Sequence, residues 1–258
     1  MGRLDDKVAF ITGGAKGIGR ATAIRFTEEG GRVCIADIDA EGGKETAQLA
    51  NEAAGMGGEA LFLPVDVTQH ESVKTAMATV KEHYGALHVL HNNVGGSTKA
   101  DGPVTEVDDS EFWRCMTVDV FSMFLGSKYG IPLIIEAGGG SVINMTSNLA
   151  LMGLAGRDCY TGAKGAVAAM TRSMAVEYAP HKIRVNAIAP SLTLTERALA
   201  QLEEPGAFSD EIRKMAATHL LGPGEPSHIA NMALYLASDE STVTTGQIMR
   251  VDSGVTIS

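Results

Sequence analysis

Short apolar segments alternate with longer stretches of helical periodicity along the whole chain. The apolar segments, such as VAFI, VCIA, LFLPV and VINM, are continuous and do not alternate with polar residues. Continuous segments of this kind are typical of parallel strands that helices cover on both faces. We therefore predict β-α-β units around one parallel sheet. Its seven strands are expected at Lys7–Thr12, Arg32–Ala36, Ala60–Val65, Leu87–Asn92, Ser141–Thr146, Arg184–Ala189 and Gln247–Val251.

Stretches with helical patterning lie between these strands. Helices are expected at Ile18–Glu29, Glu41–Ala54, Glu71–Tyr84, Ser110–Ile131, Ala163–Tyr178 and Ser227–Leu236. No linker, internal repeat or low-complexity tract interrupts the alternation. The predicted fold class is therefore α/β, a doubly wound, seven-stranded parallel sheet with helices on both faces, in a single domain over residues 1–258.

The longest stretch without strong regular patterning runs from Pro190 to Glu225. It contains several glycines and prolines and a short amphipathic piece around Ile212–Met215. Loops of this length inside a compact domain are usually functional and often act as lids. We expect a substrate lid over residues 190–225.

Composition narrows the choice of partners. Hydrophobic residues make up 45% of the chain, which is ordinary for a protein with a sizeable core. Lys and Arg number 21 against 31 Asp and Glu, so the formal net charge is −10. Such a field repels nucleic acids and anionic membrane surfaces. A small-molecule substrate is the expected partner, with neither nucleic acid nor membrane.

The cysteines and the N-terminal residues predict a cytoplasmic protein. Cys34, Cys115 and Cys159 are widely spaced and form no C-x-x-C pair, so they read as reduced thiols. The segment Met1–Lys7 lacks the basic and apolar regions of a signal peptide. The histidines are scattered, and no spacing predicts a metal site.

A glycine-rich turn follows the first predicted strand. The segment Thr12-Gly13-Gly14-Ala15-Lys16-Gly17-Ile18-Gly19 leads directly into a predicted helix. Glycines at such a turn let the backbone approach a pyrophosphate, and the helix N-terminus supplies amide donors. The turn lacks the Gly-Lys-Ser/Thr ending of a nucleoside triphosphate loop. A glycine-rich connection without a ligand is the alternative reading, which the position straight after the first strand disfavours.

Asp37 ends the second predicted strand, at about the spacing expected for a carboxylate that binds the adenosine ribose hydroxyls. A 2′-phosphate at this place would meet a like charge, which favours NAD(H) over NADP(H). Lys16 in the glycine turn could instead hold that phosphate. We give Asp37 more weight, because a lysine is flexible and can swing into solvent. A structural role for Asp37, capping the next turn, is the alternative.

Tyr160 and Lys164 lie four residues apart at the start of a predicted helix, hence on one face. A cation beside a phenol favours the phenolate, which makes tyrosine usable as a general acid or base. Ser147 ends a strand thirteen residues earlier and could hydrogen-bond a substrate oxygen. By themselves, such helix pairs are mostly ordinary structural contacts.

Residues that match one known family occur in a single order along the chain. They are Thr12-Gly13 with Gly17 and Gly19, Asp37, Asp66-Val67, Asn92-Asn93-Val94-Gly95, Ser147, Tyr160 with Lys164, Asn186 with Pro190, and Val251-Asp252-Ser253-Gly254. With them the chain resembles the short-chain dehydrogenases/reductases over essentially its whole length. The resemblance implies a Rossmann-like fold and hydride transfer between a nicotinamide cofactor and a secondary alcohol or ketone.

The resemblance also implies a role for each matching residue. Tyr160 would exchange the proton, Ser147 would position the substrate oxygen, and Lys164 would hold the nicotinamide ribose. Asp66 and Val67 would flank the adenine, Asn92 and Gly95 would line the cofactor cleft, and Thr195 would contact the nicotinamide carboxamide. The implied cofactor-binding set is Gly13, Lys16, Gly17, Ile18, Gly19, Asp37, Asp66, Val67, Asn93, Gly95, Tyr160, Lys164, Pro190, Thr193 and Thr195. A homotetramer is implied as well.

Three positions depart from the family pattern. Val94 replaces a smaller alanine, and Ser191 follows Pro190 where the family has glycine. Asp119 stands where the family has the asparagine of its catalytic tetrad. Asp119 is therefore a candidate catalytic residue that would alter the proton relay. The alternative places it on a solvated helix face, in contact with nothing catalytic.

Three functions remain in competition. The leading hypothesis is an NAD(H)-dependent alcohol dehydrogenase or ketoreductase with Tyr160 as general acid/base. A non-catalytic dinucleotide-binding regulatory or scaffold protein is the second, and an NADPH-dependent 3-oxoacyl-carrier-protein reductase is the third. Asp37 and the charge of −10 speak against the third. The segments Ser97–Pro103, Asn148–Asp158 and Leu192–Leu221 should build the substrate pocket, and their leucines indicate a largely apolar, aryl or cyclic substrate.

Overall fold

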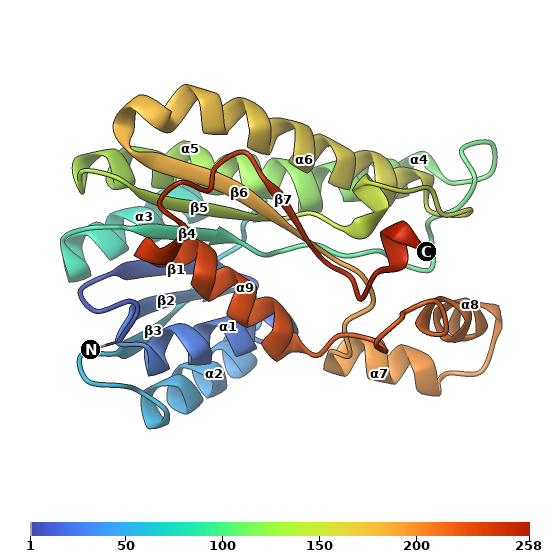
Figure 1. The fold of residues 1–258 in the computed structure, drawn as a ribbon, viewed down its shortest axis with the longest axis horizontal. Coiled ribbons are helices and arrows are strands. Elements are labelled where there is room, and N and C mark those ends of the chain that lie inside the picture. The colour runs from blue at the N-terminus through green and yellow to red at the C-terminus, as the bar shows by residue number, and fades with distance from the viewer. Residues whose placement is uncertain (1) are drawn as a thin grey trace.

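Seven parallel strands form one sheet in the order β3-β2-β1-β4-β5-β6-β7 (Figure 1). The structure is a computed structural model that describes residues 2–258, apart from the side chains at 207 and 208. Every strand lies close to its predicted place. The strands are β1 (Val8–Thr12), β2 (Arg32–Asp37), β3 (Glu59–Pro64), β4 (Val89–Asn92), β5 (Gly140–Met145), β6 (Ile183–Pro190) and β7 (Ile248–Val251).

Helices cover both faces of the sheet, as the continuous apolar strands predict. One apolar core joins the sheet to α1, α2 and α9, and a second core joins its other face to α3, α5 and α6. This arrangement confirms the doubly wound α/β prediction. The helices are α1 (Gly17–Glu28), α2 (Ala40–Glu52), α3 (His70–Tyr84), α4 (Asp109–Cys115), α5 (Ser122–Glu136), α6 (Asp158–Tyr178), α7 (Glu196–Glu203), α8 (Ala207–Ala216) and α9 (Pro226–Ala237).

The predicted helix over Ser110–Ile131 is wrong in detail. A π-helical segment, Met116–Phe121, separates α4 from α5, and α5 continues through Pro132 to Glu136. Single π-helical turns inside α-helices rotate the side chains that follow, and they are frequent at functional sites. Periodicity in the sequence cannot show such an insertion, because the apolar pattern shifts by less than one turn.

The helix that carries Tyr160 begins earlier than predicted. We expected it at Ala163, whereas α6 begins at Asp158. The buried carboxylate of Asp101 explains the difference. It accepts hydrogen bonds from the backbone amides of Cys159 (3.1 Å) and Tyr160 (3.0 Å), two of the donors that a helix N-terminus leaves unsatisfied.

The stretch expected to be largely irregular, 190–225, contains two helices. Thr195 caps α7, because its hydroxyl oxygen accepts a hydrogen bond from the amide of Ala198 at 3.2 Å. The amphipathic piece Ile212–Met215 belongs to α8. In Figure 1, α7 and α8 project beyond the sheet on the side where the strands end.

The helical stretch Asp109–Glu136 is long and apolar enough to cross a membrane, judged by length and composition alone. Within the fold, 56% of its most apolar window is buried. Its residues Leu125, Ile131 and Ile134 pack in the core beside α3. The apolar residues of this stretch therefore pack against the sheet.

Candidate active site

The glycine-rich turn connects β1 to α1 at the carboxyl end of the sheet. Gly17, the first residue of α1, has a φ of +57°, a backbone conformation that favours glycine. At Gly19, a Cβ atom would lie 2.0 Å from the carbonyl oxygen of Gly13, so no side chain fits. The turn thus presents bare backbone at a helix N-terminus, as a pyrophosphate site requires.

Asn93 braces this turn from the end of β4. Its amide nitrogen Nδ2 donates to the carbonyl oxygens of Thr12 (3.0 Å) and Gly13 (3.1 Å). Asn92, expected to line the cofactor cleft, donates instead to Asn144 Oδ1 (2.9 Å) and ties β4 to β5 inside the core. Side chains alternate along a strand, so only one of the two asparagines can face the turn.

Asp37 lies at the end of β2, beside the turn. Its Oδ2 accepts a hydrogen bond from the amide of Ala15 (3.0 Å), and its Oδ1 accepts one from the amide of Asp39 (3.0 Å). The capping role that we left open for Asp37 is therefore present. Each oxygen keeps a second lone pair, so the carboxylate can still accept ribose hydroxyls.

Asp66 and Val67 follow β3, the neighbour of β2. The Asp66 carboxylate accepts hydrogen bonds from the amide (2.9 Å) and hydroxyl (2.6 Å) of Thr68, and Val67 is buried. The ends of β2 and β3 are adjacent because Asp37 pairs in register with Pro64. The predicted adenosine-binding residues therefore lie at one edge of the sheet.

A carboxylate from the segment 190–225 contacts the glycine turn. Glu196 Oε2 accepts a hydrogen bond from the amide of Gly17 at 3.0 Å, although the two residues are 179 positions apart. A phosphate at the N-terminus of α1 would need the same donor. A phosphate bound there would compete with Glu196 for this amide. No motif in the sequence signals this contact.

Lys164 lies on α6 beneath the ring of Tyr160. Its Nζ is 5.6 Å from the centroid of the ring and donates to the carbonyl oxygen of Met145 at 2.9 Å. It also forms an ion pair of 2.9 Å with Asp119 Oδ1. The side chains of both charged residues are almost completely buried, with exposed fractions of 2% for Lys164 and 0% for Asp119.

Asp119 points into the site from the π-helical segment. Besides the ion pair, its Oδ1 accepts a hydrogen bond from the amide of Gly96 at 3.0 Å. Its Oδ2 is buried and has no hydrogen-bond partner among the residues that the structure describes. The alternative of a solvated helix position is therefore wrong. Gly95 lies against this pair, and a Cβ there would be 2.3 Å from Asp119 Oδ1.

Burial and charge act in opposite directions on the two titrating groups. For Tyr160, burial raises the pKa above its usual value of 10.0, Lys164 lowers it, and Asp119 raises it. For Lys164, burial lowers the pKa, but attraction to Asp119 and Tyr160 outweighs burial and leaves it raised. The lysine thus stays charged, and part of its field at the phenol is offset by the carboxylate.

Ser147 lies between β5 and α6 in a short polar chain. Its hydroxyl donates to Asn148 Oδ1 (3.1 Å), and Asn148 Nδ2 donates to the hydroxyl of Ser191 (3.1 Å). An interaction with Ser147 is also among the causes that lower the Tyr160 pKa. The unusual Ser191 therefore has a partner, and Asn148 is a site neighbour that the sequence motifs did not single out.

The segment 190–225 contacts the site at several points. Pro190 ends β6 and pairs in register with Val251, and the buried Thr193 forms a bridge with Gly224. Arg197 of α7 donates to the carbonyl oxygen of Ser97, and Arg157 pairs with Glu211 of α8 at 3.0 Å. These contacts connect the segment 190–225 to the loop after β4 and to the start of α6.

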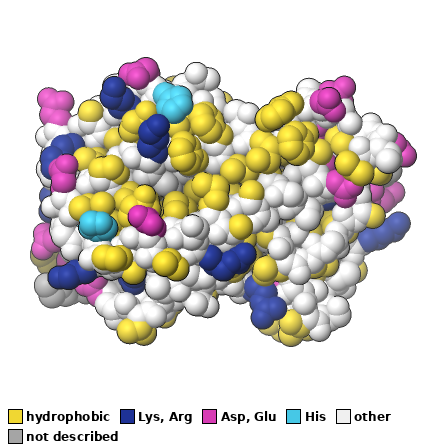
Figure 2. Space-filling view, turned by 90° about the horizontal axis from the view of Figure 1, so that it is seen from above, with side chains coloured by type: hydrophobic (Ala, Val, Ile, Leu, Met, Phe, Trp, Pro, Cys, Tyr) yellow, Lys and Arg dark blue, Asp and Glu magenta, His cyan; other side chains and the backbone are white. Residues whose placement is uncertain are grey.

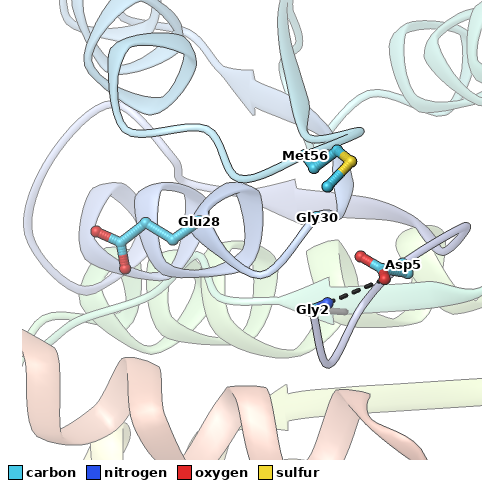
Figure 3. Close-up of a pocket in the computed structure, with 5 residues that line it drawn as sticks. All are labelled: Gly2, Asp5, Glu28, Gly30 and Met56. Carbon is cyan, nitrogen blue, oxygen red and sulfur yellow. Dashed lines mark hydrogen bonds between the residues drawn. The ribbon is translucent and has the colours of Figure 1, made fainter.

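Two of the cavities among the described residues differ in their relation to the site. The larger, of about 330 Å³, is lined by Gly2, Asp5, Glu28, Gly30 and Met56 and includes none of the site residues (Figure 3). The other, of about 250 Å³, lies where Leu192, Leu221 and the buried His219 of the segment 190–225 meet the end of β7. Leu192 and Leu221 are among the residues expected to build the substrate pocket. Within residues 2–258, leaving aside side chains 207 and 208, no group of three His, Cys, Asp or Glu residues is suited to a metal ion.

Known proteins resemble this chain over nearly its full length. The family model described as enoyl-(acyl carrier protein) reductase matches residues 13–256. An uncharacterised oxidoreductase of Bacillus subtilis is 39% identical, covering 99% of this chain and 93% of the relative. A 2,5-dichloro-2,5-cyclohexadiene-1,4-diol dehydrogenase of Sphingobium indicum is 37% identical, covering 98% and 97%.

A solved structure agrees with the fold as well. Carveol dehydrogenase from Mycobacterium avium, in complex with NAD, superposes with a TM-score of 0.90 at 29% identity, covering 100% of both chains. The doubly wound sheet and its glycine-rich turn define a Rossmann-type dinucleotide-binding fold, and the relatives that match it are named as oxidoreductases and dehydrogenases. The chain belongs to the short-chain dehydrogenase/reductase family.

Proposed function

We propose that this protein is an NAD(H)-dependent dehydrogenase that interconverts a secondary alcohol and a ketone. The observation that carries the proposal is the group of Tyr160, Lys164 and Ser147 at the carboxyl end of the sheet, with a buried cation below the phenol. A protein that only binds a dinucleotide has no need of a buried lysine paired to this tyrosine. The bound nicotinamide would supply the hydride acceptor or donor.

The residues of the chain supply the proton transfer. In alcohol oxidation, the Tyr160 phenolate takes the hydroxyl proton, and in ketone reduction the phenol donates a proton to the carbonyl oxygen. The charge of Lys164 stabilises the phenolate form. Ser147 hydrogen-bonds the substrate oxygen and so sets its distance from the phenol. Closure of the lid, residues 190–225, would exclude water from this site.

Asp37 supports NAD(H) over NADP(H), because its carboxylate accepts the ribose hydroxyls and repels a 2′-phosphate. We expect the protein to bind NADH more tightly than NADPH by about tenfold or more. The Asp37→Ala variant should narrow this difference in affinity, chiefly because it binds NADH more weakly. Fluorescence titration with each cofactor measures both constants. Equal or tighter binding of NADPH by the wild type would contradict the assignment of Asp37.

A cyclic, largely apolar alcohol is the substrate class that we propose. The segments around the site offer Leu149, Leu151, Leu154 and Leu192, and two proteins similar to this chain are named for activity on cyclic alcohols. A panel of cyclic and open-chain secondary alcohols, assayed by NADH formation, tests the class. A preference for 3-oxoacyl thioesters with NADPH would support the carrier-protein reductase reading, and inactivity on every substrate would support a binding protein.

The Asp119→Asn variant should shift the pH dependence of alcohol oxidation. The oxidation rate rises with pH as Tyr160 becomes phenolate, and Asp119 raises the Tyr160 pKa. Removing its charge should therefore move this rise to lower pH, with turnover at the optimum changed by less than about tenfold. Initial rates of the wild type and of the Asp119→Asn variant across the pH range measure the shift. An unmoved profile would show that Asp119 acts through position and not through charge.

We also propose a cytoplasmic homotetramer assembled through α5 and α6. Figure 2 looks onto the top of Figure 1, where these helices lie, and hydrophobic side chains gather over this face. Phe124 of α5 is 40% exposed and Val176 of α6 is 79% exposed. Exposed apolar faces of this kind mark contact surfaces. Sedimentation of the purified protein measures the oligomeric state.

A further inference from the structure

The glycine-rich turn contains a cation where NAD(H) preference calls for none. Lys16 lies between Gly17 and Ala15, whose amide donates a hydrogen bond to Asp37 at 3.0 Å. A lysine beside the adenosine ribose is a ready partner for a 2′-phosphate, which would favour NADP(H). Its Nζ instead lies 2.7 Å from Oδ2 of Asp39. The partner of Lys16 is therefore Asp39, a residue outside the family motif.

Asp39 is held in place from two further directions. Its Oδ1 accepts a hydrogen bond from the amide of Gly42 at 3.0 Å and so caps the N-terminus of α2. Its own amide donates to Asp37 Oδ1 at 3.0 Å. Asp39 is thus positioned by the backbone, whereas the Lys16 side chain is 64% exposed and long enough to move. The carboxylate can direct the lysine, not the reverse.

Arg20, the second cation beside the turn, is likewise paired with a carboxylate. Arg20 pairs with Glu45 at 2.6 Å, and its Nε donates to the carbonyl oxygen of Ala15 at 3.0 Å. Three carboxylates, Asp37, Asp39 and Glu45, therefore face two cations, Lys16 and Arg20. The net charge of these five side chains is −1, and each of the two cations already pairs with a carboxylate.

We propose that Asp39 is a second residue that determines cofactor specificity, because it pairs with Lys16 and withholds this cation from a 2′-phosphate. The inference rests on the proposed dinucleotide-dependent function. Asp37 disfavours the phosphate by repulsion, and Asp39 removes the attraction that Lys16 would otherwise provide. The hydrogen bond to Asp39 also raises the Lys16 pKa, so the lysine stays charged and the pair persists around neutral pH.

The Asp39→Asn variant tests the proposal directly. Asparagine caps a helix as well as aspartate does, so α2 keeps its N-cap while the charge is lost. NADPH should then bind on the order of tenfold more tightly, as a charge-assisted contact with Lys16 becomes available. NADH should stay within about twofold of the wild type. Fluorescence titration of the wild type and of the Asp39→Asn variant with NADH and with NADPH provides the four dissociation constants.

Two further variants identify the cause. Lys16→Gln alone should leave the ratio of the NADPH and NADH affinities within about twofold, because the Lys16 side chain does not bind a 2′-phosphate in the wild type. In the Asp39→Asn background, Lys16→Gln should abolish the gain for NADPH. Asp239→Asn removes a carboxylate from a different ion pair, with Lys7, and should leave the NADH to NADPH ratio unchanged. It controls for the change in net charge.

The outcomes separate this inference from the proposed function. An Asp39→Asn variant that binds NADH normally but gains nothing for NADPH overturns the inference and leaves the function intact. If the Asp39→Asn variant keeps its gain in NADPH affinity after Lys16→Gln is added, the inference is also overturned. The loss of one negative charge near the turn, and not the release of Lys16, would then be the cause. A loss of affinity in Lys16→Gln alone that affects NADPH but not NADH would also overturn the inference, because Lys16 would then already bind the 2′-phosphate. A wild type that binds neither cofactor refutes the proposed function itself.

Discussion

Turnover of the Tyr160→Phe variant is expected to fall by on the order of 10²–10⁴-fold, the usual scale of general acid–base catalysis. Phenylalanine removes the hydroxyl and keeps the ring that lies 5.6 Å above Lys164 Nζ. The main chain of residue 160 also remains held by Asp101. The loss should therefore fall mainly on the proton transfer, and NADH should still bind.

Steady-state rates and NADH titration on the same preparation test this expectation. Tyr178, the last residue of the same helix, offers a matched control, because Tyr178→Phe removes a hydroxyl from α6 outside the site. That variant should retain normal turnover. Near-normal turnover of Tyr160→Phe on a good substrate would refute Tyr160 as the acid/base.

The Lys164→Met variant should lose both activity and stability. Methionine keeps much of the apolar stem but leaves Asp119 buried with one hydrogen-bond donor, the amide of Gly96. Leaving one member of a buried ion pair uncompensated costs about 3–5 kcal/mol. Turnover should also fall by at least about 10²-fold, because the phenolate loses the cation that stabilises it.

The double variant Asp119→Asn with Lys164→Met separates the two effects. Removing both charges should recover most of the lost stability, because no uncompensated charge remains buried. Activity should stay low, since the cation is still missing. Urea unfolding and steady-state assays measure the two quantities. If Lys164→Met alone unfolds like the wild type, the ion pair with Asp119 does not contribute to stability.

Much of the fold could be predicted from the sequence, because its determinants are local. Continuous apolar segments followed by helical periodicity specify β-α-β units, and parallel strands joined by helices wind in one hand. The glycine-rich turn is likewise a local signal, since the glycines at 13, 17 and 19 fall directly after a strand. Tyr160 and Lys164 could be placed on one face because a helix brings residues four apart together.

The contacts that complete the site could not be predicted, because they join distant parts of the chain. Asp101 determines where the helix of Tyr160 begins, and Glu196 reaches the amide of Gly17 across 179 positions. Sequence periodicity reports which face of an element is buried, but not which partner faces it there.

Asp119 shows the same division within a single residue. Its departure from the family pattern is visible in the sequence, whereas its direction depends on the π-helical turn that carries it. In the folded protein this turn buries the carboxylate against Lys164. The sequence by itself therefore determined which groups are present, and tertiary packing decided which charges meet without water between them.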